Sequence, residues 1–98
     1  MTLLNEGKIF GGTFNSIEGA MEKHIRMQEV IAHNIANAKT PGYRALVFDA
    51  ELKKAIERTD NPTVSLDDEM VSLVENRGAY SSLVRLMSSK INMYRTVA

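Results

Sequence analysis

The chain has 98 residues, which is enough for one small domain with a limited core of its own. Lysine and arginine together number 12, as do aspartate and glutamate, so the formal net charge is zero, which argues against a nucleic-acid binder and favours self-association. The absence of cysteine excludes disulfides and thiolate metal sites.

The first twelve residues have little apolar pattern and contain three glycines. We predict a flexible N-terminal arm over residues 1–12. Residues 1–10 form no apolar run long enough for a signal peptide, and no stretch of the chain approaches a transmembrane span. A chain of this kind that works outside the cytoplasm is expected to leave by a route that needs no cleaved signal.

A regular apolar pattern begins at Phe14 and continues to Ala38. Its steps alternate between three and four residues, which predicts a heptad-patterned helix over residues 13–38. Two polar residues, His24 and Gln28, interrupt the apolar positions. We interpret them as a partly wet site that limits the registers in which a partner helix can pair.

A helix stop follows at residues 37–43. Pro41 lacks an amide hydrogen and disfavours the helical conformation at Thr40. Gly42 can supply the positive φ that the third position of a type II turn requires, and Asn37 can end a helix. The chain is therefore expected to change direction here.

The connecting segment, residues 39–64, has mixed character. Arg44 to Asp49 is apolar in its middle and predicts an extended segment laid against the helices. Ala50 to Arg58 has apolar and charged residues on opposite sides of a helical wheel, which predicts a minor amphipathic helix. Residues 59–63 carry loop signals throughout.

A second long pattern runs from Ser65 to the last residue and predicts a C-terminal helix over residues 65–98. The Ser65 hydroxyl can cap this helix, and Asp67, Asp68 and Glu69 place negative charge at the positive end of its dipole. Gly78 lies inside the helix and indicates a soft point or a close approach between helices.

Two long terminal helices joined by a short connection predict an all-α fold, an antiparallel hairpin or coiled coil, in one helical domain over residues 13–98. Each apolar stripe is wider than one partner helix can cover, so we expect neighbouring molecules to bury the remainder. The residues expected to carry folding and assembly, called here the seam, are Phe14, Ile17, Met21, Ile31, Ile35, Met70, Leu73, Tyr80, Val84, Met87, Ile91 and Tyr94.

The sequence offers no set of residues for catalysis. His24 and His33 would point to opposite sides of one helix and cannot share a metal ion. The acidic residues 67–69 are consecutive and therefore spread around their helix. No phosphate-binding glycine loop is present. We expect no catalytic, metal or cofactor site and no enzymatic activity.

The helix stop also resembles a known sequence signature. The residues Asn34, Ile35, Ala36 and Asn37, followed by Thr40, Pro41, Gly42 and Tyr43, are similar to the N-terminal motif of bacterial flagellar rod and hook proteins. Residues 27–33 before it, and the pattern from Val64 to Thr96, resemble the proximal-rod members of that family. The connecting segment is shorter here than is usual, and His33 replaces a small or amide residue.

This resemblance implies a structural subunit of the flagellar basal body. Such proteins leave through the flagellar type III export apparatus without a cleaved signal and assemble as the periplasmic rod. The implied partners are further copies, other rod proteins, and the export gate and inner-membrane ring junction, with no nucleic acid and no direct membrane insertion. The motif would set the angle at which the chain leaves the first helix.

A second hypothesis remains open from the same features. A helical hairpin with wide apolar stripes also suits an adaptor or secretion chaperone that binds a partner helix. A soluble stoichiometric complex with a client, together with absence from basal bodies, would favour that alternative.

Overall fold

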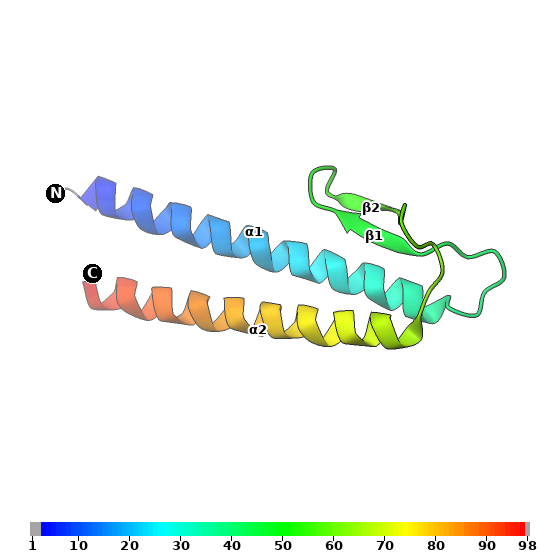
Figure 1. Ribbon diagram of the computed structural model, residues 1–98. Coiled ribbons are helices and arrows are strands. Elements are labelled where there is room, and N and C mark those ends of the chain that lie inside the picture. The colour runs from blue at the N-terminus through cyan, green and yellow to red at the C-terminus, as the bar shows by residue number, and fades with distance from the viewer. Residues whose placement is uncertain (1–2, 98) are drawn as a thin grey trace.

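The computed structural model describes residues 3–97, with side chains over residues 12–96. Two long helices, α1 (Leu3–Ala36) and α2 (Leu66–Val97), run antiparallel and in contact along their length (Figure 1). A hairpin of two short strands, β1 (Leu46–Asp49) and β2 (Lys54–Glu57), lies along α1 near its C-terminal end. The molecule is elongated, with extents of 60 × 24 × 17 Å.

The predicted pair of antiparallel terminal helices is confirmed, but their boundaries differ. Helix α1 begins at Leu3, so residues 3–12 belong to the helix and do not form a separate arm. Their glycines each cost about 1 kcal/mol of helix propensity, yet no proline interrupts the run. The helix ends at Ala36, two residues before the predicted end, with amide hydrogen bonds of Asn37 and Ala38 tightening its last turn.

The minor helix predicted for Ala50–Arg58 is wrong. Residues 54–57 form β2, which pairs antiparallel with β1 in the register Leu46↔Glu57 to Asp49↔Lys54. The predicted extended character of residues 44–49 is confirmed by β1. A nine-residue helix is marginal on its own, whereas an extended neighbour offers four paired residues at once.

The turn between β1 and β2 is stabilised by the side chain of Asp49. The Asp49 carboxylate accepts hydrogen bonds from the amides of Glu51 and Leu52, each at 2.9 Å. Lys53 then adopts a left-handed conformation, with φ of 54°, and returns the chain into β2. The turn between β1 and β2 is thus formed by local interactions, although the helix-forming composition of this segment predicted a helix.

Helix α2 begins as predicted. The Ser65 hydroxyl accepts a 3.4 Å hydrogen bond from the Asp68 amide, and the Glu69 amide donates to the Ser65 carbonyl at 2.9 Å. Three acidic residues occupy the first turn, where they oppose the positive end of the dipole. The close helix approach suggested for Gly78 is not found, because nothing would lie within 4 Å of a Cβ at that position.

A polar contact fixes the register of the two helices near their middle. The buried Asn76 side chain donates to the His24 carbonyl and accepts from His24 Nδ1, both at 2.6 Å. Because the amide nitrogen is committed to the carbonyl, His24 Nδ1 must carry a hydrogen. Asn76 of α2 is therefore the residue that pairs with His24, the position predicted to limit the register.

The core between the helices is thin. Ile17 and Ile31 of α1 are 5% and 8% exposed, while Ala45, just before β1, is completely buried. Several large apolar side chains stay in solvent on the remaining helix faces. Those of the described residues that are classed as exposed on α2 are Leu66, Met70, Val71, Val74, Val84, Leu86, Ile91, Met93 and Tyr94.

The predicted seam divides into two lines, which differ in exposure. On α2, Leu73, Tyr80 and Met87 follow a seven-residue spacing and are half-buried. The parallel line of Met70, Val84 and Ile91 also has seven-residue spacing, with Arg77 between its first two members, and is 50%, 40% and 37% exposed. One partner helix therefore covers only one line of the stripe. We call the exposed one the outer line.

The seam on α1 shows the same division to a smaller degree. Ile17 and Ile31 are buried, whereas Phe14, Met21 and Ile35 are half-buried. At the open end of the hairpin, the Phe14 ring meets Tyr94 edge-on with centroids 6.4 Å apart. The coiled-coil geometry expected from the heptads stays a prediction.

Candidate functional site

The motif turn has the geometry expected from its sequence. Pro41 and Gly42 occupy the two central positions, and the Tyr43 amide donates to the Thr40 carbonyl at 3.1 Å. Gly42 has φ of 78°, the left-handed value that the third position of a type II turn requires. The turn carries Tyr43 back towards the end of α1.

Asn34 joins the helix to the start of β1. Its amide nitrogen donates to the Leu46 carbonyl and its carbonyl oxygen accepts from the Leu46 amide, both at 2.9 Å. The side chain therefore pairs with Leu46 as a neighbouring strand would, and it is fully buried. Only an amide side chain of this length offers a donor and an acceptor at the same position.

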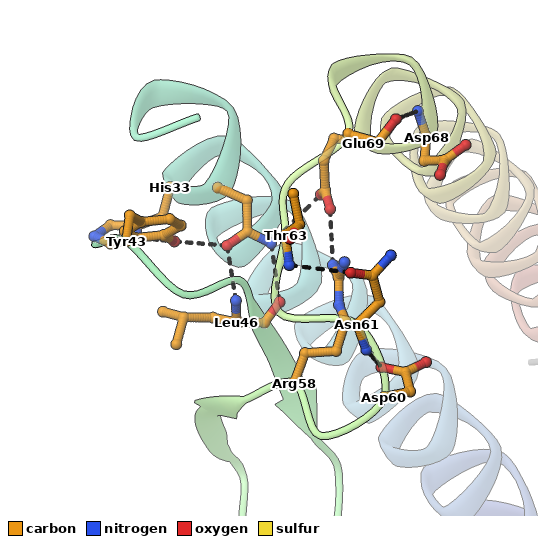
Figure 2. A network of polar contacts seen from close by, with 11 residues as sticks. His33, Tyr43, Leu46, Arg58, Asp60, Asn61, Thr63, Asp68 and Glu69 are labelled. Carbon is orange, nitrogen blue, oxygen red and sulfur yellow. Dashed lines mark hydrogen bonds and ion pairs between the residues drawn. The ribbon is translucent and has the colours of Figure 1, made fainter. Parts of the chain in front are cut away.

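Tyr43 and His33, which are both labelled in Figure 2, extend the polar contacts of Asn34. The Tyr43 hydroxyl donates to Asn34 Oδ1 at 2.6 Å, and His33 Nδ1 lies 2.8 Å from the same hydroxyl. Because the hydroxyl proton is already committed, His33 Nδ1 must be the donor in the second contact. His33, which directly precedes the motif, thus contacts the motif tyrosine.

Glu69 and Arg58 complete the contacts on the other side. Glu69, in the first turn of α2, is 3% exposed and accepts from Arg58 Nη2 at 2.7 Å and from Asn34 Nδ2 at 3.4 Å. Arg58 directly follows β2. Three segments that are distant in the sequence therefore meet at one carboxylate, and we call Asn34, Tyr43, Arg58 and Glu69 the clamp.

Next to the clamp, both backbone groups of Ala45 are hydrogen-bonded. The buried Ala45 donates its amide hydrogen to the Pro62 carbonyl and accepts from the Arg58 amide, both at 2.8 Å. In the loop that follows, the Thr63 amide donates to the Asn61 side chain (Figure 2). No buried side-chain nitrogen or oxygen among the described residues is left without a hydrogen bond.

The clamp has the chemistry of a structural joint. Burial raises the pKa of the Tyr43 hydroxyl above its ordinary value of 10.0, and the Glu69 carboxylate raises it further, while Arg58 opposes the shift. The phenol therefore stays a neutral hydrogen-bond donor over the physiological range. Among residues 12–96, whose side chains are described, no group of three or more acidic, histidine or cysteine residues could hold a metal ion.

The structure brings together only part of the predicted motif. Asn34 and Tyr43 belong to the clamp, and Asn37 caps the helix end through the His33 carbonyl and the Thr40 hydroxyl. Ile35 is half-buried on α1. The remaining motif residues, Ala36, Thr40, Pro41 and Gly42, are exposed and shape the turn.

Three polar residues of this site and of the helix contact were not singled out from the sequence. Arg58 had been placed at the end of a helix, and Glu69 had been interpreted only as a charge at a helix end. Asn76 belongs to the C-terminal pattern that resembles the rod proteins, but that resemblance predicts no contact for it. Glu69 lies 35 residues from Asn34, and Asn76 lies 52 residues from His24, so no local pattern could have paired them.

Comparison with known proteins gives one family. The family of flagella basal body rod proteins matches residues 14–44, which include two residues of the clamp, Asn34 and Tyr43. Rod proteins are structural, so the family points to a non-enzyme. No helix within residues 3–97 is long and apolar enough to cross a membrane.

Individual relatives agree with the family match. The flagellar basal body rod protein FlgB of Proteus mirabilis strain HI4320 is 47% identical over 47 residues, covering 46% of this chain and 34% of that protein. The FlgB proteins of Escherichia coli K12 and of Shigella flexneri are each 48% identical over 46 residues, covering 45% of this chain and 33% of theirs. The matched part thus spans about a third of the relatives' length. Over the part they match, these comparisons show that the chain is similar to FlgB-type proteins of the flagellar basal body rod family.

Proposed function

We propose that this chain is a structural subunit of the proximal rod of the bacterial flagellar basal body. The observation that carries the proposal is the family match over residues 14–44, which ends just past the motif turn. In this role the protein is exported by the flagellar type III apparatus and assembles in the periplasm through its terminal helices. Its neighbours are further copies, other rod proteins, and the export gate and inner-membrane ring junction.

The arrangement of the clamp supports a role in fixing geometry. Asn34 and Glu69 hold the end of α1, the start of β1 and the first turn of α2 in one place. A rod subunit needs a constant angle between its inner helices and the chain that leaves them, because an error repeats in every copy. The motif residues Asn34, Asn37, Pro41, Gly42 and Tyr43 would set that angle.

The outer line supports assembly through the helices. Met70, Val84 and Ile91 are large apolar side chains that stay 37–50% exposed in the single chain. Large apolar side chains that gather on an exposed surface are typical of a protein interface. Neighbouring subunits that cover this line would bury the apolar side chains that α1 leaves exposed on α2.

The experiment places a charge on the outer line. We expect Val84→Asp and Ile91→Asp, expressed in cells that lack the native copy, to abolish swimming, because a charge in a desolvated helix contact prevents rod assembly. Both residues are exposed in the single chain, so the monomer should keep its fold. The export apparatus should still form, and circular dichroism should show unchanged helix content.

Ser89→Asp provides the matched control. Ser89 is exposed on the same helix, and its position two residues from Ile91 places it on another side of that helix. It should swim normally. Normal swimming of both outer-line variants would contradict assembly through this line. Recovery of the chain in a soluble complex with a client protein would instead favour an adaptor or a chaperone.

A further inference from the structure

Residues of α1 and of the hairpin formed by β1 and β2 line a groove. This hairpin lies on the side of α1 that faces away from α2 (Figure 1). Its volume is about 540 Å³. The apolar part of its lining comes from Val30 of α1 and from Phe48, Ala50 and Ala55 of the hairpin. Groove and α2 therefore lie on opposite sides of the same helix.

The charges that line the groove are unbalanced. Arg26 is shared between Glu22 and Glu29, at 3.8 and 3.4 Å, so these three residues together carry one negative charge. Lys23, Lys53 and Lys54 also line the groove, and among the described residues they form no ion pair. The lining therefore carries four positive and two negative charges, so the groove combines an apolar floor with a net charge of +2.

The complementary surface is found on the first half of α2. Leu66, Met70, Val71 and Val74 are large apolar side chains of α2 that are 44–67% exposed. Exposed acidic residues, Asp67, Asp68 and Glu75, surround them, and none forms an ion pair among the described residues. We call this surface the acidic patch.

We propose that the groove binds the acidic patch of a second copy of this chain. Three free lysines meet three free carboxylates, and apolar side chains on each side cover one another. The groove and the patch lie on opposite sides of the molecule, so the contact is head-to-tail and each copy keeps one surface open for the next. This inference deepens the proposed function on which it rests, since it names a contact between rod subunits that shares only Met70 with the seam.

Cysteine cross-linking tests the contact directly, because the chain has no cysteine of its own. Ala55 in the groove and Val71 in the patch are both exposed. Under mild oxidation, the purified full chain carrying both Ala55→Cys and Val71→Cys should give a ladder of dimers, trimers and longer species. Neither single variant should cross-link, because groove does not meet groove and patch does not meet patch.

Charge reversal adds a second, independent measurement. Lys23→Glu with Lys53→Asp reverses the groove, and Asp67→Lys with Glu75→Lys reverses the patch. Aspartate is chosen at position 53 because it tolerates the left-handed backbone there. Each double variant should weaken self-association at least about tenfold in sedimentation velocity, since like charges then face one another. Mixing the two variants should restore association, because every groove then finds a patch of opposite charge.

The outcomes separate this contact from the proposed function. Dimers from either single-cysteine variant, absence of a ladder from the pair, or a mixture that stays as weakly associated as its components would overturn the contact. Swimming by cells that carry a non-cross-linking pair would leave the rod function intact and remove only this interface. A cross-linked ladder from a chain that is absent from basal bodies would support this contact and contradict the rod function.

Discussion

Asn34 is the side chain on which most polar contacts around the motif turn converge. It is completely buried, and its amide meets both backbone groups of Leu46, the Tyr43 hydroxyl and Glu69. An apolar or shorter side chain would leave these groups unpaired in a dry place. The cost of such a loss exceeds the net gain from an ordinary hydrogen bond.

We therefore expect Asn34→Ala to lower the free energy of unfolding by about 2–4 kcal/mol, since several buried groups lose their partner. Asn37→Ala is the control, because its bonds to the His33 carbonyl and the Thr40 hydroxyl are exposed to solvent. It should cost about 1 kcal/mol or less. Urea unfolding followed by circular dichroism measures both, and equal losses would contradict a special role for Asn34.

Tyr43 makes the clamp sensitive to alkaline pH. Its pKa is raised in the folded chain, mainly by burial, so the unfolded chain loses this proton first as the pH rises. The Tyr43 contribution to stability is therefore complete below pH 10.0 and is lost as the pH rises through the higher folded value.

The comparison with Tyr43→Phe isolates this effect from the lysines, which titrate in the same range. Near neutral pH the wild type should be more stable than Tyr43→Phe by about 0.5–1.5 kcal/mol, the value of a typical hydrogen bond. Denaturant unfolding at a series of pH values should show this difference shrinking above about pH 10. A difference that stays constant or grows with pH would show that the folded state does not hold the proton.

Among the secondary-structure elements, the helices and the turn between α1 and β1 were predictable from the sequence, and the hairpin was not. Apolar steps of three and four residues, a serine cap, and Pro41 with Gly42 are local signals that fix a helix or a turn wherever they occur. Residues 54–57 have helix-forming composition but become a strand because β1 lies beside them. Such a preference arises from tertiary contact and cannot be predicted from composition.

The residues of the candidate site were also only partly predictable from the sequence. The motif residues Asn34 and Tyr43 could be selected from a local signature, and the structure places both in the clamp. Glu69 and Arg58 could not, because their contact with Asn34 depends on how α2 and β2 return to the end of α1. The acidic first turn of α2 has an ordinary explanation in the helix dipole, which concealed the buried role of one member.

Two glycines test the difference between a turn and a helix. Gly42 has φ of 78°, so Gly42→Ala should destabilise the fold by about 1–2 kcal/mol although nothing crowds the position. Gly78 lies in α2, with nothing within 4 Å of an added Cβ, so Gly78→Ala should stabilise by about 0.5–1 kcal/mol. Thermal unfolding of both variants checks the opposite signs. A gain from Gly42→Ala would contradict the turn geometry.

The whole molecule combines a rigid joint with an incompletely covered surface. The clamp holds one end of an elongated hairpin, the His24–Asn76 contact fixes its register, and the outer line stays in solvent. A protein that worked as a single chain would gain nothing from such a line of apolar side chains. A subunit that repeats along a rod would bury it in every copy.

Detection of this chain in purified basal bodies tests that account most directly. Basal bodies isolated with detergent and washed in high salt should contain the chain in a constant ratio to the ring proteins, while Val84→Asp cells should yield rings without it. Absence of the wild-type chain from basal bodies, with its recovery in a soluble stoichiometric complex with another protein, would contradict a rod subunit.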